Sequence, residues 1–121
     1  MRNRGISGLA LVAVLLGLVA GCAAGPATTP TPATATVVDV RTAEEYAEGH
    51  LQGAVNIDLM SQSFPADIGA LPKDAEYVVY CRSGNRSAQA ATIMRQAGLT
   101  VQDAGGIDKA SASTGLPIVT D

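Results

Sequence analysis

Residues 77–87 read YVVYCRSGNRS. The apolar run at 77–80 predicts a short buried strand that ends at Cys81. Residues 87–97 predict a helix with Gly98 as its C-cap, in which the apolar contacts come from Ala88, Ala91, Ile93 and Met94. Between strand and helix lies a short loop of small and turn-forming residues with an arginine at each end. This succession is typical of a nucleophilic site that handles anions.

The loop that follows Cys81 has the composition needed to activate its thiol. A thiol reacts as the thiolate, which a helix N-terminus and nearby cations stabilise. Small residues at 83–85 let the backbone curl and direct its N–H groups inward as an anion cradle. The alternative is that Cys81 is an inert core residue at the end of a strand. The candidate site is Cys81 as the nucleophile, with Arg82, Ser83, Gly84, Asn85 and Arg86 as substrate-binding residues.

Strand and helix patterns alternate along the rest of this region. The β-branched run at 37–40 predicts a strand. Thr42 with Glu45 three residues later is a capping box, so a helix begins there and ends near Gly49. Further elements are expected at 54–57 (strand), 59–71 (helix with an irregular start around Pro65) and 100–102 (strand), with a tight turn at Gly105-Gly106 and a partly irregular tail at 107–121. The alternation predicts an α/β fold with a central parallel sheet flanked by helices, whose site lies at the carboxyl ends of the strands.

The first 22 residues have the layout of a bacterial secretory signal. Arg2 and Arg4 precede an apolar run at 6–20 that is short for a membrane span. The ending VAGC at 19–22 resembles the lipobox of bacterial lipoproteins, which implies that Cys22 is acylated and becomes the N-terminus. The alternatives are an ordinary cleaved signal with a free cysteine, and an uncleaved anchor. A disulfide between Cys22 and Cys81 is a further alternative, although each cysteine lies in a context of its own.

Residues 23–35 contain Ala, Thr and Pro with one Gly, which favours an extended, water-exposed tether. The expected organisation is a lipoprotein signal peptide at 1–21, the lipidated Cys22 and tether at 22–35, and one folded domain at 36–121. The expected location is the cell membrane, with a lipid anchor on the extracytoplasmic side. The chain has 8 basic and 11 acidic side chains and no Trp, so we expect no nucleic-acid partner.

The folded part resembles the rhodanese-like sulfurtransferases. The matching motifs occur in the family's order: Val38-Asp39-Val40-Arg41, Glu45-Tyr46, GHLQGAVNI at 49–57, Tyr80-Cys81 through Ser87, Gly105-Gly106-Ile107 and Gly115-Leu116-Pro117. They span about residues 36–119. Asp39, Arg41 and His50 are interpreted as structural. The sequence departs from the family at Ala110, where an aromatic residue is common, and this indicates a looser core near 107–114.

The resemblance implies an enzyme of the thiosulfate sulfurtransferase type. Cys81 would accept sulfane sulfur from a small anionic donor as a persulfide and pass it to a thiol, to cyanide or to a partner protein. The related phosphatases have one residue more between the cysteine and the arginine, so phosphatase activity is not expected. We expect no cofactor and no metal. The alternative is a non-catalytic module at the cell surface that carries sulfur, binds a partner or senses oxidants.

Overall fold

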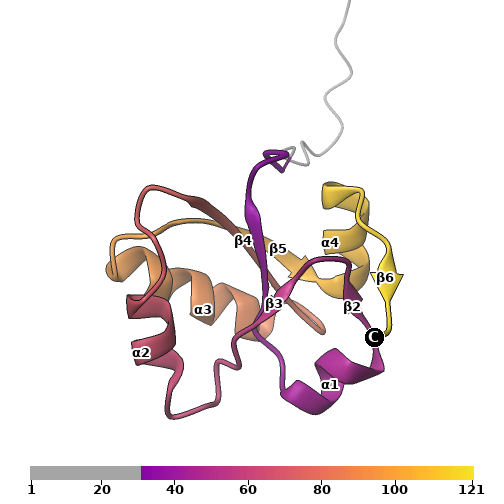
Figure 1. The fold of residues 1–121 in the computed structure, drawn as a ribbon, viewed down its shortest axis with the longest axis horizontal. Coiled ribbons are helices and arrows are strands. Elements are labelled where there is room, and N and C mark those ends of the chain that lie inside the picture. The colour runs from indigo at the N-terminus through magenta and orange to yellow at the C-terminus, as the bar shows by residue number, and fades with distance from the viewer. Residues whose placement is uncertain (1–30) are drawn as a thin grey trace, which may run out of the picture.

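The computed structural model describes residues 31–121, which form a four-stranded sheet, a second two-stranded sheet and four helices (Figure 1). The elements in chain order are β1 (Thr36–Asp39), α1 (Ala43–Glu48), β2 (His50–Leu51), β3 (Val55–Asn56), α2 (Phe64–Gly69), β4 (Glu76–Cys81), α3 (Asn85–Gln96), β5 (Thr100–Gly106), α4 (Ile107–Thr114) and β6 (Ile118–Val119). The larger sheet has the order β3-β1-β4-β5, and all of its pairings are parallel. The predicted fold class is therefore confirmed.

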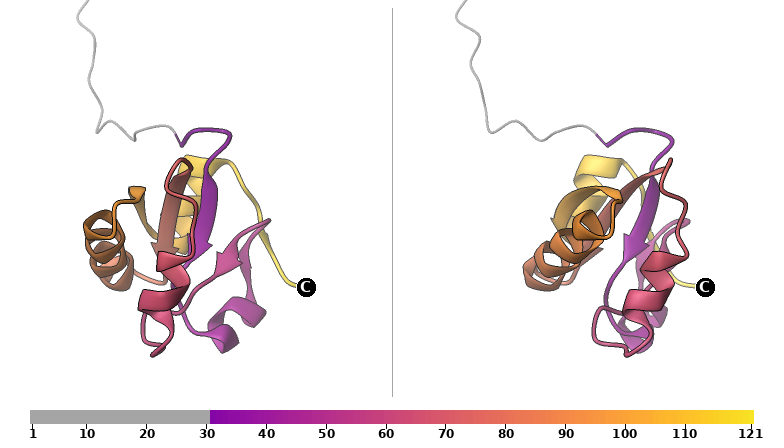
Figure 2. Two further views of the ribbon diagram at one scale, coloured as in Figure 1. Left: turned by 60° about the vertical axis from the view of Figure 1, so that its left-hand side comes forward. Right: turned by 90° about the vertical axis from the view of Figure 1, so that its left-hand side faces the viewer.

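The two central strands are buried on both faces, which explains their continuous apolar sequences. Val38 and Val79 face one core with α2 and α3, whereas Val37 and Val78 face a second core with α4. Figure 2 shows α2 and α3 on one side of the sheet and α4 on the other. The first core also includes Phe64, Ile68, Ala90, Ala91 and Met94, and the second includes Leu51, Tyr80, Ala104 and Ala110. The sheet thus fixes the position of the residues that follow β4.

The capping box predicted at Thr42 is present. The Thr42 side chain accepts a hydrogen bond from the Glu45 backbone N–H at 3.2 Å, and the Glu45 carboxylate accepts one from the Thr42 N–H at 3.1 Å. The helix ends at Gly49, as the sequence predicts. Short helices depend on such caps because they bury few side chains, and α1 has no fully buried side chain.

The tight turn predicted at Gly105-Gly106 was wrong, whereas the tail at 107–121 is partly irregular as expected, at residues 115–117 and 120–121. Gly105 and Gly106 do not form a tight turn: they end β5, and α4 begins at the next residue. The tail also contains β6, which pairs antiparallel with β2. The Ser- and Ala-rich helix has little apolar periodicity and buries only Ala110. Gly115 caps α4 with φ 73° and was the sequence signal for the end of this helix, but without apolar periodicity before it the helix itself was not predicted.

Two other helices differ from their expected bounds. Helix α2 begins only at Phe64, after turns in which Asp58 accepts a hydrogen bond from the Met60 N–H at 2.8 Å. Helix α3 begins at Asn85, and its buried alanines are Ala90 and Ala91, whereas Ala88 and Ile93 are exposed. Two of the four residues predicted to make apolar contacts, Ala88 and Ile93, are therefore exposed instead of buried.

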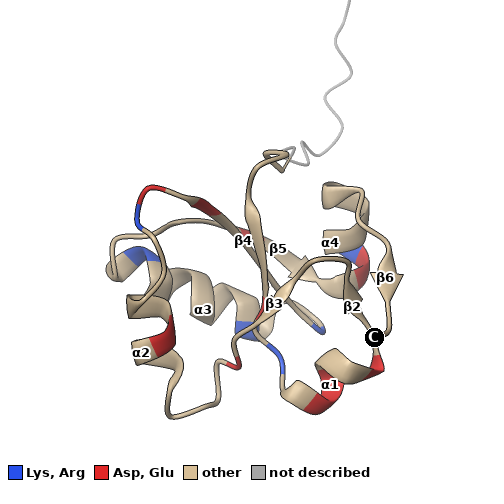
Figure 3. Ribbon diagram, in the orientation of Figure 1, with Lys and Arg blue, Asp and Glu red and all other residues tan. Residues whose placement is uncertain are grey.

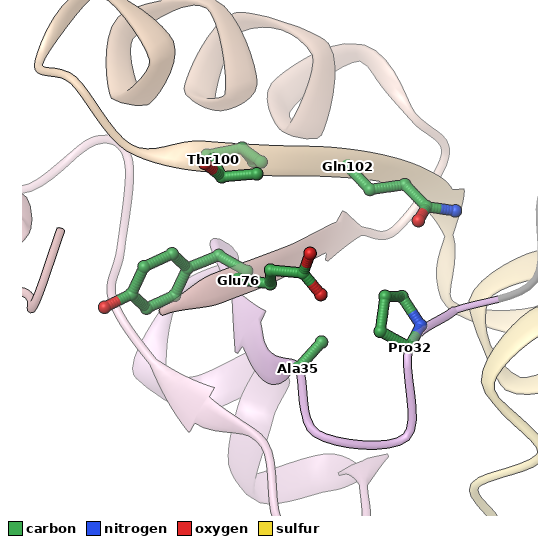
Figure 4. Close-up of a pocket in the computed structure, with 7 residues that line it drawn as sticks. Pro32, Ala35, Glu76, Thr100 and Gln102 are labelled. Atoms are coloured by element: carbon green, nitrogen blue, oxygen red, sulfur yellow. The ribbon is translucent and has the colours of Figure 1, made fainter. Parts of the chain in front are cut away.

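The two ends of the parallel sheet are occupied differently. Pro32 and Ala35 lie at the amino end, where they line a small pocket with Glu76 and Thr100, the first residues of β4 and β5 (Figure 4). Cys81 lies at the carboxyl end.

No helix within residues 31–121 is long and apolar enough to span a membrane. The expected signal peptide and the lipidated Cys22 lie outside the described residues.

Candidate active site

Cys81 is the last residue of β4, in the centre of the parallel sheet. Its side chain is fully buried and contacts the core on the side of α2 and α3. A register shift after Val79 pairs Cys81 with Gly106 of β5. The strand therefore delivers the sulfur to the point where the loop 82–84 turns into α3, as expected for ligand sites in parallel sheets.

The Cys81 sulfur takes part in hydrogen bonds with the loop and with α3. The Gly84 N–H donates to Cys81 Sγ at 2.9 Å, and the Cys81 thiol donates to Ser87 Oγ at 3.5 Å. Once the thiol has lost its proton, the Ser87 hydroxyl can turn from the Gly84 carbonyl and donate to the thiolate. Burial raises the pKa of the Cys81 thiol, but the hydroxyl of Ser87 and the backbone N–H groups of Ser87, Gly84 and Ser83 lower it by more. The net pKa is lower than that of an ordinary cysteine. The inert-core interpretation explains the burial but not this set of donors.

The Ser87 hydroxyl is held in place by the loop itself. Ser87 is fully buried, and its Oγ donates to the carbonyl of Gly84 at 3.1 Å. It lies in the first turn of α3, a helix of 12 residues whose N-terminal N–H groups face the loop. Ser87 was quoted in the loop motif but was not predicted as a site residue. Its position one residue after Arg86 was the available signal.

The backbone of the loop requires two glycines. Gly84 has φ 108°, a conformation that side chains with a Cβ rarely adopt. Gly106 contacts the loop from β5: a Cβ placed on it would lie 2.8 Å from the carbonyl oxygen of Arg82 and 3.4 Å from the Cα of Ser83. The Gly105-Gly106 pair therefore lets the end of β5 approach the cysteine loop.

The two arginines of the loop have different surroundings. Arg86 forms a two-pronged ion pair with Glu45 of α1, from Nη1 to Oε2 at 2.7 Å and from Nη2 to Oε1 at 2.9 Å. Arg82 is exposed, and its guanidinium has no hydrogen bond or ion pair within residues 31–121. Figure 3 shows the basic start of α3 beside the acidic α1 at this edge of the molecule. That Arg86 contacts a donor stays a prediction.

Glu45 was not predicted to belong to this region. The sequence assigned Glu45 to the capping box of the helix, but the carboxylate is also partly buried between Thr42 and Arg86. The hydrogen bonds from Arg86 are the main cause that lowers its pKa to about 2, from an ordinary value of 4.5. The carboxylate thus joins the start of α1 to the start of α3.

Asp39, Arg41 and His50, which the sequence predicted to be structural, make contacts that hold α1 in place next to the site. Arg41 pairs with Asp39, with 2.6 Å between Nη2 and Oδ2, and the same nitrogen donates to the Gly49 carbonyl. His50 Nδ1 contacts the carbonyl of Tyr46 at 2.9 Å, and the two rings stack 3.7 Å apart. These contacts fix both ends of α1. Within residues 31–121 no group of three or more side chains could hold a metal ion.

This α/β domain holds a cysteine of lowered pKa at the end of a central strand, directly before a loop and a helix, an arrangement suited to nucleophilic attack. Residues 27–112 match the family of the rhodanese-like domain. The chain is 40% identical over 85 residues to a sulfurtransferase from Allochromatium vinosum, covering 69% of this chain and 77% of that protein. It is 38% identical over 71 residues to the thiosulfate sulfurtransferase PspE of Escherichia coli, covering 58% and 68%.

Solved structures agree with the sequence relatives. A rhodanese-related protein from Thermoplasma volcanium has a TM-score of 0.62 at 32% identity, over 73% of this chain and 86% of that chain. A rhodanese with anions from E. coli has a TM-score of 0.59 at 32% identity, over 71% and 98%. The chain belongs to the rhodanese-like family, and its relatives and structure identify it as an enzyme of the rhodanese type, a sulfurtransferase.

Proposed function

We propose that Cys81 carries sulfane sulfur as a persulfide, taking it from thiosulfate or a persulfide donor and passing it to a thiol or to cyanide. The observation that supports this most directly is the pair of contacts at Cys81 Sγ: the Gly84 N–H donates to it, and Ser87 Oγ accepts from the thiol. The Gly84 N–H, together with the Ser87 hydroxyl once it turns toward the deprotonated sulfur, stabilises the thiolate before the reaction and the anionic persulfide after it.

The proposed first half-reaction needs no general base once the thiolate is present. The Cys81 thiolate attacks the outer sulfur of thiosulfate, a new S–S bond forms, and the S–S bond of thiosulfate breaks. Its electron pair leaves on sulfite, which carries away two negative charges, and the third remains on the persulfide. The N–H of Gly84 is in position to face that charge.

In the second half-reaction an acceptor thiolate or cyanide attacks the outer sulfur of the persulfide. The S–S bond to Cys81 breaks, and its electron pair returns to the Cys81 thiolate. The product is a persulfide or thiocyanate, and the enzyme is restored without an external oxidant or reductant. Ser87 stabilises the thiolate that leaves in this step as it does the thiolate that attacks in the first.

The test is sulfur transfer from thiosulfate to cyanide by the wild type and by Cys81→Ser, with mass spectrometry after thiosulfate alone. We expect turnover together with an adduct of about 32 Da, one sulfur atom formed in a covalent step, and the loss of both in the variant. A folded wild type that gives neither with thiosulfate nor with a persulfide would contradict the proposal. It would favour the non-catalytic module that binds a partner or senses oxidants.

We further propose that the protein is lipid-anchored at Cys22 on the extracytoplasmic side of the membrane. The apolar run that ends at Val19-Ala20-Gly21-Cys22 supports this proposal, together with the start of β1 at the end of the sheet opposite Cys81. A membrane anchor on that side would leave the cysteine loop accessible. In the full chain, Cys22→Ala should move the protein from the membrane fraction to the soluble fraction. Retention in the membrane would contradict lipidation at Cys22.

A further inference from the structure

The ion pair between Glu45 and Arg86 has a consequence for the choice of sulfur donor. Both terminal nitrogens of Arg86 are bonded to the two carboxylate oxygens of Glu45, at 2.7 and 2.9 Å. A guanidinium recognises a sulfonate or sulfite group best through this same two-pronged edge. In the structure that edge is occupied by a carboxylate of the protein.

The position of Glu45 is fixed independently of Arg86. Its Oε2 accepts hydrogen bonds from the backbone N–H and the hydroxyl of Thr42, at 3.1 and 3.2 Å. These bonds close the capping box of α1, so the carboxylate is held at the helix start. An anionic donor would therefore have to displace a preorganised carboxylate in order to bind Arg86.

We infer that Glu45 is a specificity-determining, positioning residue that withholds Arg86 from the donor and biases the enzyme toward persulfide donors over thiosulfate. This inference rests on the proposed persulfide chemistry of Cys81. Thiosulfate is a compact dianion, and both charges remain on the departing sulfite. A persulfide donor carries at most one negative charge on its sulfur pair. When Cys81 takes its outer sulfur, the S–S bond of the donor breaks and a single thiolate leaves, so this donor depends less on a guanidinium than the thiosulfate dianion does.

Two other cations lie near the loop, and their attraction for thiosulfate limits how large the effect of Arg86 can be. Arg82 directly follows Cys81 and has no ion pair within residues 31–121, and the same holds for Lys109, whose side chain lies against Gly105. The groups that lower the pKa of the Cys81 thiol are chiefly the Ser87 hydroxyl and backbone N–H groups, and Arg86 has a Coulombic interaction with Cys81 besides its stronger hydrogen bonds to Glu45. Neutralising Arg86 therefore affects the binding of a dianion more than it affects the nucleophile.

The test compares kcat/KM for thiosulfate with kcat/KM for cysteine persulfide, both with cyanide as the acceptor. Glu45→Gln keeps a side chain that closes a capping box but removes the charge that holds Arg86. We expect the ratio of thiosulfate to persulfide to rise at least about threefold, the effect of one partly exposed charge, mainly through a lower KM for thiosulfate. Glu48→Gln removes the same charge from an exposed site on the same helix and should leave the ratio near that of the wild type.

A double variant tests whether the effect of Glu45→Gln on the ratio depends on Arg86. Glu45→Gln combined with Arg86→Gln removes both charges, and we expect its ratio to match that of the wild type because Arg86 is already withheld there. A ratio that is unchanged in Glu45→Gln, or that falls in the double variant, would overturn the inference. The absence of any persulfide adduct on the wild type with either donor would instead overturn the proposed function itself. Thermal unfolding of each variant shows that the folded state is being compared.

Discussion

Gly106 and Arg82 are in backbone contact: a Cβ on Gly106 would lie 2.8 Å from the carbonyl oxygen of Arg82. The first of these residues ends β5, and the second begins the loop after Cys81. The separation is shorter than a carbon and a backbone oxygen normally allow. The loop conformation therefore depends on the absence of a side chain on the neighbouring strand.

Gly106→Ala should displace the cysteine loop. The added methyl group can be accommodated only if the backbone at 82–83 moves, which disturbs the donors around Cys81 Sγ. We expect a loss of about 1–3 kcal/mol in the free energy of unfolding, the usual cost of overpacking, and a larger proportional loss of kcat/KM. Chemical denaturation and sulfur-transfer kinetics measure the two effects.

Gly69→Ala is the matched control. Gly69 lies in α2, and a Cβ there would meet nothing within 4 Å. The substitution should stabilise the domain slightly, by about 0.5–1 kcal/mol, because alanine is the better helix former. Equal losses in Gly106→Ala and Gly69→Ala would show that the contact with Arg82 is not the cause.

Ser87→Ala should weaken the nucleophile without removing it. The hydroxyl lies 3.5 Å from Cys81 Sγ and is one of the groups that lower the pKa of the thiol. Its loss should raise that pKa and slow persulfide formation near neutral pH by about threefold to tenfold, as expected for the net contribution of one ordinary hydrogen bond. The rates of variant and wild type should converge at high pH. A constant ratio across the pH range would mean that Ser87 acts through packing alone.

Asp39→Asn should destabilise the fold by about 3 kcal/mol or more. Asp39 is fully buried and its carboxylate meets Arg41 at 2.6 Å, so the variant leaves a buried guanidinium without its counter-charge. Urea denaturation measures the loss. Asp74→Asn, at an exposed position, serves as the control and should change the stability by less than about 0.5 kcal/mol. A similar small change in Asp39→Asn would contradict the importance assigned to the pair.

The pair of Glu45 and Arg86 should make stability depend on acid pH. Arg86 lowers the pKa of Glu45 to about 2 in the folded protein, against an ordinary 4.5. A lowered carboxylate pKa contributes stability that is complete above the ordinary pKa and is lost as the pH falls through the folded value. The wild type should therefore lose stability relative to Glu45→Gln between about pH 4.5 and pH 2. Parallel stability curves for the two proteins would disprove a contribution from this carboxylate.

The features that were predictable from the sequence are those with strong local signals. The β-branched run before Asp39 and the apolar run before Cys81 can be buried only as central strands, and Thr42 with Glu45 specifies a helix start. Cys81 itself was identifiable because a strand, a glycine-containing loop and a helix follow one another without a gap. These patterns each lie within about ten residues of sequence.

The features that were not predictable depend on contacts between distant residues. Arg86 and Glu45 are separated by 41 positions, and nothing local distinguishes Glu45 from a solvated glutamate on the same helix. The pairing of β6 with β2 likewise joins residues that are far apart in the sequence, Ile118–Val119 and His50–Leu51. Helix α4 was missed because serine and alanine give no apolar stripe, although the glycine at its end marked its boundary.

All strands of the main sheet point in one direction, so the amino end of β1 and the sulfur of Cys81 lie at opposite poles of the domain (Figure 1). Pro32 and Ala35, which precede β1, lie at that amino end and therefore away from the reacting atoms. The domain can therefore be attached at one end while it reacts at the other. Immobilising it through the amino end of β1, on a bead or on another protein, leaves the Cys81 loop on the side that faces away from the support.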